Sequence, residues 1–180
     1  GSDTYVIGMV ARLREEKRHD LALEALALLH ERGQDATLCI VGDGPEEQRL
    51  RAVAKRLGVD GNVLWAGPRE NAGRLMPAFD ADLITSSVEG MPLAALEALV
   101  EGVPVVSTRV GVMPALLADG GGTIVERATP DGVADALARA LATSRDTPMG
   151  PSMELARARY GIDSVARHLE QMYDAAIAAF

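Results

Sequence analysis

Short apolar segments alternate with amphipathic segments along almost the whole of this chain. Each apolar segment has the length and composition of a buried strand, and the segment after it has the apolar spacing of a helix. The alternation occurs six times. Repeats of this kind favour a parallel sheet with helices on both faces and right-handed connections. The predicted fold class is therefore α/β with a parallel β-sheet.

The boundaries of these elements follow from turn residues and from the apolar pattern. The predicted strands cover 5–10, 36–41, 62–65, 82–84, 103–106 and 123–125. The predicted helices cover 20–31, 46–57, 73–79, a segment with Pro92 as its first helical residue, 130–142, 153–159 and 163–179. A polar linker is predicted over 143–151.

Length and composition limit the possible classes of protein. The 180 residues are 48% apolar, which suits one domain with a stable core. Gly1 and Ser2 have the composition of a cleavage scar, so the domain is expected to cover 3–180. A single cysteine, Cys39, argues against disulfides and metal clusters and favours a reducing, cytoplasmic compartment. The net charge of −8 disfavours nucleic acid and anionic membranes as partners.

Charged residues follow several of the predicted strands. Arg12 and Lys17 follow the first strand, Asp43 follows the second, and Glu89 follows the fourth. Parallel sheets bind ligands beyond the carboxyl ends of their strands, so these side chains are expected to converge at one edge.

The segment 86–97 has the features of a site for an anion flanked by hydroxyl groups. A helix start presents unpaired N–H groups and partial positive charge, and Gly90 allows a ligand to approach the backbone. Glu89 and Glu97 can accept hydrogen bonds from hydroxyls. A nucleotide-sugar, with a diphosphate between two diols, would satisfy all three features. The alternative is a capped helix with one solvated glutamate and one capping glutamate.

A basic cluster occupies the turn before the first predicted helix. It contains Arg12, Arg14, Lys17 and Arg18. Such clusters are usually exposed solubilising turns, and this alternative stays open. Cations are unfavourable at a helix N-terminus, however, so their presence there also suggests an anionic ligand.

The spacing around the two glutamates resembles a known signature. Glu89, Gly90, Pro92, Glu97 and Ala98 match the Glu-Gly-x-Pro…Glu-Ala pattern of the retaining glycosyltransferases of group 1, also called family 4. The following Gly-Val-Pro-Val-Val run, 102–106, matches the next strand of that family. The resemblance implies the C-terminal, donor-binding half of a GT-B fold, with a Rossmann-like parallel sheet.

The same resemblance implies roles for residues of the basic turn. Ala11-Arg12-Leu13 and Lys17 match the family's Gly-Arg-Leu-x-x-x-Lys-Gly motif, with Ala11 and Arg18 in place of the two glycines. By this resemblance Arg12 and Lys17 grip the donor diphosphate. Together with Glu89, which would bind hydroxyls of the transferred sugar, they form the expected catalytic set.

Other residues are expected to bind the donor without taking part in the chemistry. By resemblance Glu97 binds the ribose diol, Asp43 lies at the floor of the nucleotide site, and the loop with Arg69 passes the nucleobase. The helix start supplies the remaining contacts, from Gly90, Met91, Pro92 and Leu93.

One loop departs from the family pattern. The family has Gly-Gly-x-Pro-Glu where this chain has Gly111-Val112-Met113-Pro114-Ala115. A glycine and a glutamate are therefore missing, which leaves a phosphate contact from this loop open.

The resemblance implies retaining transfer of a hexosyl group from a UDP-, GDP- or ADP-sugar to an acceptor hydroxyl. No metal or other cofactor is expected, because two cations and a helix end would neutralise the diphosphate. An N-terminal acceptor domain, absent from this chain, would complete the enzyme and make any membrane contact. The chain alone is therefore expected to bind a donor without transferring sugar.

Two other functions stay open. One is a nucleotide-sugar-binding module without activity, in which Glu89 would be replaceable. The other is a different enzyme on the same half-fold, such as a nucleotide-sugar epimerase or a phosphorylase. A phosphorylase would prefer free phosphate or a sugar phosphate to a nucleoside diphosphate.

Overall fold

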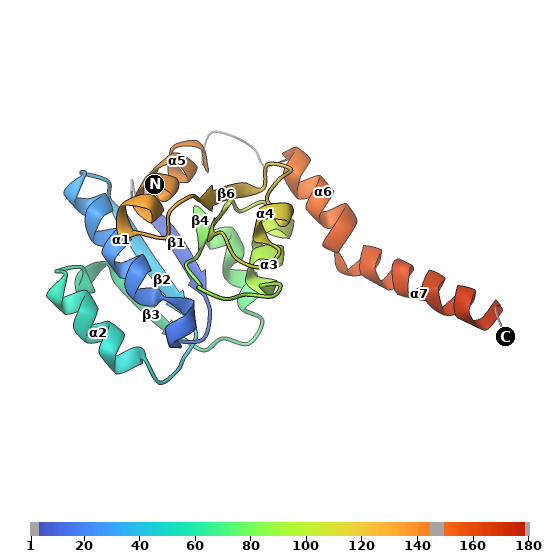
Figure 1. Cartoon of the computed structure of the whole chain (residues 1–180), viewed down its shortest axis with the longest axis horizontal. Helices are drawn as coiled ribbons and strands as arrows, with labels where there is room; N and C mark the ends of the chain where they lie inside the picture. The colour runs from blue at the N-terminus through green and yellow to red at the C-terminus, as the bar shows by residue number, and fades with distance from the viewer. Residues whose placement is uncertain (1–3, 145–149, 179–180) are drawn as a thin grey trace.

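A computed structural model describes residues 4–144 and 150–178 of the chain (Figure 1). Its centre is a six-stranded sheet in the order β3-β2-β1-β4-β5-β6, and every neighbouring pair is parallel. The strands are β1 Tyr5–Val10, β2 Ala36–Val41, β3 Val63–Gly67, β4 Ala81–Ile84, β5 Val105–Thr108 and β6 Gly122–Val125. The predicted α/β class with a parallel sheet is confirmed.

Helices connect the strands and follow the last one. The α-helices are α1 His19–Glu31, α2 Glu47–Arg56, α3 Leu93–Glu101, α4 Met113–Leu116, α5 Pro130–Ser144, α6 Gly150–Tyr160 and α7 Ile162–Ala178. The described residues also form three short 3-10 helices, η1 Glu15–Lys17, η2 Asp60–Asn62 and η3 Ala72–Ala78.

Successive side chains of a strand point to opposite faces of the sheet, and helices cover the apolar side chains on both faces. Ile7 and Met9 of β1 face a core that contains buried residues of α1, α2 and α5. Val6 and Val10 face a second core with residues of η3, α3, α4 and α6. The chain therefore folds as three layers, with the sheet in the middle (Figure 1).

Two predicted boundaries around α3 were wrong by a few residues. Pro92 is not helical, since its φ of −71° and ψ of 117° are extended, and α3 begins at Leu93. The strand predicted from residue 103 begins at Val105 instead. The reason is a helix-ending motif: Gly102 is left-handed, and the Val103 N–H donates to the Ala98 carbonyl over 2.8 Å.

The other predicted elements are present within a few residues of their predicted ends, with two differences of type. The segment predicted as a short helix over 73–79 is the 3-10 helix η3. The ends of the predicted linker 143–151 belong to α5 and α6, while 145–149 lie outside the described residues. Gly1, Ser2 and residue 179, the predicted end of the last helix, also lie outside them.

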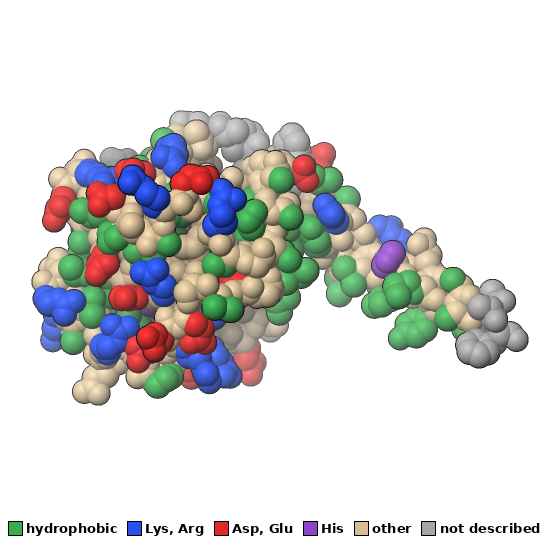
Figure 2. Space-filling view, viewed as in Figure 1, with side chains coloured by type: hydrophobic (Ala, Val, Ile, Leu, Met, Phe, Trp, Pro, Cys, Tyr) green, Lys and Arg blue, Asp and Glu red, His purple; other side chains and the backbone are tan. Residues whose placement is uncertain are grey.

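Helix α7 extends from α6 away from the sheet (Figure 1). One of its faces carries Val165, Leu169, Met172, Tyr173 and Ile177, which are between 41% and 73% exposed. Figure 2 shows this row of hydrophobic side chains along the arm. None of the described helices has the length and apolar character needed to span a membrane.

Candidate functional site

A cavity of about 630 Å³ opens at the carboxyl ends of β1 and β4. These two strands are neighbours in the sheet, although the chain forms two other strands between them. The connections of β1 and β4 leave in opposite directions there, which is where open α/β sheets bind their ligands. The strand ends contribute Met9, Val10, Leu83 and Ile84 to the wall.

The turn after β1 supplies cations to this cavity, and both Arg12 and Lys17 line it. The turn is held against the connection after β2, because the Leu13 N–H donates to the Asp43 carbonyl over 2.8 Å. Gly44 makes this close approach possible, since a Cβ there would lie 2.3 Å from the Leu13 carbonyl oxygen. The run Gly42-Asp43-Gly44-Pro45 after β2 therefore shapes the basic turn.

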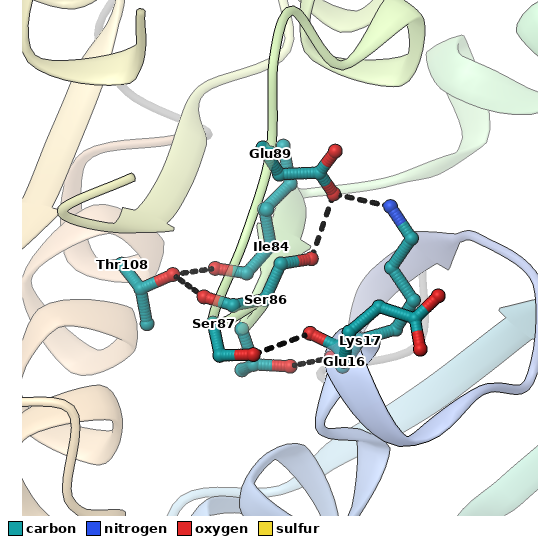
Figure 3. A network of polar contacts seen from close by, with 8 residues as sticks. Glu16, Lys17, Ile84, Ser86, Ser87, Glu89 and Thr108 are labelled. Atoms are coloured by element: carbon teal, nitrogen blue, oxygen red, sulfur yellow. Dashed lines mark hydrogen bonds and ion pairs between the residues drawn. The ribbon is translucent and has the colours of Figure 1, made fainter. Parts of the chain in front are cut away.

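Lys17 and Glu89 form an ion pair across the cavity floor. The Lys17 Nζ lies 2.5 Å from Glu89 Oε1, and the Ser86 hydroxyl donates to the same oxygen over 2.7 Å (Figure 3). Thr108 of β5 donates to the Ser86 carbonyl over 2.7 Å. Both charged side chains are mostly buried, with 22% of Lys17 and 12% of Glu89 exposed. Each would carry an unfavourable unpaired charge without the other.

The start of α3 faces the cavity from the β4 side. Met91, Pro92 and Leu93 line it, and the first N–H groups of a helix have no partner inside the helix. Gly90 does not line the cavity, but it adjoins open space, since a Cβ there would meet no atom within 4 Å. The first N–H groups of α3 can therefore contribute a partial positive charge to this side of the cavity.

The loop 111–115, which differs from the family pattern, has a structural role that was not predicted from the sequence. The Val112 N–H donates to the Gly90 carbonyl over 3.2 Å. Gly111 has a φ of +49°, and a Cβ there would lie 2.3 Å from the Glu89 carbonyl oxygen. The loop therefore braces the Glu89 turn, and the Val112 N–H already has a partner within the chain.

Glu97 lines the cavity from the second turn of α3. Its carboxylate lies against η3, where a Cβ on Gly73 would approach Glu97 Cδ to 2.9 Å. The absence of a side chain at Gly73 leaves room for this carboxylate beside the cavity.

Two buried polar residues near the site were not assigned to it from the sequence. Asp82 of β4 is fully buried, and neither of its carboxylate oxygens has a hydrogen-bond partner within the described chain. Burial raises the pKa of Asp82 to about 7, and the charge of Glu97 adds to the rise. The signal was an ionisable residue inside an apolar strand segment.

His19 is the other buried polar residue. It is the first residue of α1, and both ring nitrogens lack partners among the residues described. Burial lowers the pKa of His19 to about 4, so the ring is neutral at pH 7.

The structure gathers most of the predicted site residues in one place. Arg12, Lys17, Glu89, Met91, Pro92, Leu93 and Glu97 all line the cavity. Arg14, Glu16 and Ser86 also line it, and no individual role was predicted for these three residues.

Three predicted residues do not line this cavity: Gly90, which directly precedes its lining residue Met91, and Asp43 and Arg69, which lie elsewhere. Asp43 lines a neighbouring cavity of about 470 Å³, which shares Arg12 and Arg14 with the first. Arg69 is exposed in the loop after β3, the edge strand, and does not line the main cavity. In the described part of the chain, no three His, Cys, Asp or Glu side chains are grouped so that they could hold a metal ion.

Known proteins share this sequence pattern over most of the chain. The model of the family Glycosyl transferases group 1 matches residues 1–151. The D-inositol 3-phosphate glycosyltransferase of Corynebacterium urealyticum is 33% identical over 93% of this chain and 42% of its own length. A GDP-mannose-dependent phosphatidylinositol monomannoside mannosyltransferase of Mycolicibacterium smegmatis is 34% identical over 79% of this chain and 40% of its own. The chain thus spans about two fifths of the length of these curated relatives.

Solved structures agree in fold. A structure of Anabaena HepE in complex with UDP and glucose superimposes with a TM-score of 0.84 at 23% identity, over 96% of this chain and 48% of that one. The C-terminal domain of a group 1 glycosyl transferase from Francisella tularensis has a TM-score of 0.75 at 25% identity, over 88% of this chain and 87% of that one. With a matching family model, matching relatives and a shared fold, the chain belongs to the group 1 glycosyl transferases and has the fold of their C-terminal GT-B domain.

Proposed function

We propose that this chain is the donor-binding half of a retaining glycosyltransferase that transfers a hexosyl group from a nucleotide-sugar. The observation that carries the proposal is the cavity between β1 and β4. Its lining combines three cations, three carboxylates and the start of a helix. These groups match a diphosphate with a diol on either side.

The diphosphate would lie between the basic turn and the start of α3. Arg12 is exposed at the cavity, with no ion pair to any other described residue, so its guanidinium is available to an anion. Charge grows on the diphosphate as the sugar leaves. Fixed cations and helix N–H groups stabilise that charge without rearranging, which lowers the barrier.

Donor binding would change the partners of Lys17 and Glu89. The phosphate oxygens would compete for the Lys17 ammonium, and a sugar hydroxyl would donate to Glu89 in its place. Ser86 can keep its hydrogen bond to Glu89 during the exchange and hold the carboxylate in position. The ion pair therefore keeps both side chains aimed at the cavity until the donor replaces it.

Glu97 would accept hydrogen bonds from the ribose diol. Its place against η3 leaves the nucleobase on the side of the loop after β3, which carries Arg69. Arg69 does not line the main cavity, so we propose that this loop contacts the base through backbone atoms.

The acceptor and part of the catalytic apparatus would come from the remaining length of the whole protein. Some curated relatives are more than twice as long as the segment that they share with this chain. We propose that an N-terminal domain covers the cavity, excludes water and positions the attacking hydroxyl. Positioning of this kind can lower a barrier by about 7 to 11 kcal/mol. Retention would follow from attack on the face that the diphosphate leaves, and we propose that no metal is needed.

A thermal-shift panel with UDP, GDP, ADP and their glucose or mannose conjugates tests this proposal. One nucleotide series should raise the melting temperature of the chain, and inorganic phosphate should not compete with it. Arg12→Ala should reduce the shift strongly, whereas Arg32→Ala, which removes two surface ion pairs between the end of α1 and α5, should keep it. A preference for phosphate over every nucleotide would support a phosphorylase instead.

The inactive-module alternative is tested by transfer. The whole protein should give a glycoside by mass spectrometry, and this chain alone should bind donor without forming product. Turnover by the chain alone would contradict the proposed division between two domains.

A further inference from the structure

The turn after β4 holds the turn after β1 through backbone carbonyls. The Ser87 N–H donates to the Glu16 carbonyl over 2.8 Å. The Thr85 hydroxyl lies 2.8 Å from the Lys17 carbonyl and 2.9 Å from the Arg18 carbonyl, so its proton is shared between the two. Thr85 is fully buried, directly after the last residue of β4. Three successive carbonyls of the basic turn are thus anchored to the neighbouring strand end.

The anchored turn has an unfavourable backbone conformation. Arg18 has a φ of 50° and a ψ of 49°. This is the left-handed conformation, which residues other than glycine seldom adopt. The related motif described above has glycine at this position. A left-handed residue of this kind persists only where its surroundings hold it. The Thr85 hydroxyl binds the carbonyl of this residue and that of the residue before it.

The residue before Arg18 is Lys17, whose ammonium reaches Glu89 at the cavity floor. Holding the Arg18 turn therefore fixes the origin of the Lys17 side chain relative to the Glu89 turn. We propose that Thr85 is a positioning residue that acts through the Arg18 turn to set Lys17 for the donor diphosphate. The inference rests on the proposed function, because it assigns the effect to donor affinity.

A purely structural role would give a different result. If Thr85 only bound these two carbonyls, its loss would lower stability and leave the affinity of the folded chain unchanged. If it positions Lys17, affinity falls in molecules that are still folded. The two roles therefore separate when affinity is measured well below the unfolding temperature of each variant.

The experiment compares Thr85→Val, which removes the hydroxyl but keeps the shape, with Thr85→Ser, which keeps the hydroxyl. The matched control is Ser107→Ala, which removes an equally buried hydroxyl that bonds to the carbonyl of Thr108. UDP, GDP and ADP are titrated by calorimetry. Thr85→Val should weaken the nucleotide that the unmodified chain binds by about 3- to 10-fold, the effect of about one hydrogen bond. Thr85→Ser and the control should stay within about twofold.

Arg18→Gly tests the route of the effect. Glycine adopts the left-handed turn without help, so Thr85→Val in the Arg18→Gly background should cost less than about twofold in affinity. This double variant also remains measurable if Thr85→Val alone folds poorly. Amide exchange at Ser87 should quicken in Thr85→Val and return towards normal in the double variant.

Three results would overturn the inference. Unchanged affinity in folded Thr85→Val would leave Thr85 with a structural role only. If Thr85→Val lowers affinity equally in the unmodified chain and in the Arg18→Gly background, the effect does not act through the Arg18 turn. If the unmodified chain binds none of the three nucleotides, the proposed function itself fails, and the inference fails with it.

Discussion

The turn between β1 and α1 and the turn between β4 and α3 meet at the same cavity, but they bring opposite charges to it. The first contributes the cations Arg12, Arg14 and Lys17 against one carboxylate, Glu16, and it is followed by a helix whose first residue is a buried neutral histidine. The second contributes the carboxylate of Glu89 and leads into α3, which adds its open start and the carboxylate of Glu97. Neither turn alone could bind both parts of a sugar nucleotide.

The difference shows that the site depends on which strands are neighbours. The two turns are 72 residues apart at Lys17 and Glu89, and they meet because β1 lies beside β4. Lys17 of one turn then neutralises Glu89 of the other, so neither carries an unpaired charge in a mostly buried place. Removing cations from the first turn should therefore weaken binding of the diphosphate, whereas removing carboxylates from the other side should weaken binding of the hydroxyl groups.

The largest effect should come from removing the cations of the first turn. Arg12→Ala combined with Lys17→Ala should weaken nucleoside diphosphate binding by about 3 to 6 kcal/mol, since each charge-assisted hydrogen bond contributes about 1.5 to 3 kcal/mol. The fold should remain intact, as shown by far-ultraviolet circular dichroism. Calorimetry measures the affinity, and Arg32→Ala is the control. Unchanged affinity would place the diphosphate outside this cavity.

The second effect concerns the stability of the fold and arises from Asp82 of β4, the strand that precedes the second turn. Between pH 4 and 7 the Asp82 carboxyl is protonated in the folded chain, because its pKa is raised from 3.8 to about 7, and ionised in the unfolded chain. Stability is therefore lost as pH rises through this window, at about 1.4 kcal/mol per pH unit and on the order of 4 kcal/mol in all.

Asp82→Asn cannot ionise, so the chain with asparagine should gain stability relative to the unmodified chain as pH rises towards about 7. Urea unfolding at several pH values measures the difference. His19 contributes with the opposite sign, since its lowered pKa makes the fold less stable as pH falls from about 6.5 to about 4. Its contribution cancels in the comparison of the two chains. A stability difference that is constant with pH would contradict the buried, protonated carboxyl.

A smaller effect should separate Glu89 of the second turn from Glu97 of the helix that follows it. Glu97→Gln should weaken binding of the bare nucleoside diphosphate by about 1 to 2 kcal/mol, because its proposed partner is the ribose. Glu89→Gln should leave that affinity unchanged or slightly improved, since it releases Lys17, and should weaken only the full nucleotide-sugar. Titrations of both variants with both ligands decide the matter. Equal losses throughout would remove the distinction between the two glutamates.

The smallest effect is expected at Arg69, which belongs to neither turn. Arg69→Ala should change nucleotide affinity by less than about 0.5 kcal/mol, the usual range for an exposed side chain without special contacts. Arg14→Ala, at a residue that lines both cavities, is the informative companion variant. A larger loss for Arg69 than for Arg14 would show that the nucleobase loop binds through side chains.

Local patterns predicted much of this fold and of this site. The strands at 5–10 and 36–41 have the predicted bounds, because continuous apolar runs between turn residues leave little freedom. The strand-helix alternation predicted a parallel sheet, and a parallel sheet directs all its strand ends to one edge. Residues that follow β1 and β4 could thus be placed near one another before their exact neighbours were known.

The remaining features depend on contacts between distant segments. The pairing of Lys17 with Glu89, the brace from Gly111 and the anchoring of Arg18 by Thr85 need the order of strands, which no local pattern contains. Asp43 followed the same rule as Arg12, but β2 lies one strand away from the β1–β4 junction, so Asp43 faces a neighbouring cavity.

The most direct test of the central claim is a map of backbone amide shifts while the nucleotide-sugar that stabilises the chain is added. Binding across the β1–β4 junction predicts that the largest shifts fall in both turns, at residues 12–18 and 89–97, in the same titration step. Arg12→Ala should weaken the shifts of both turns together. Shifts confined to one turn, or centred on another part of the chain, would contradict a donor site built jointly by the two.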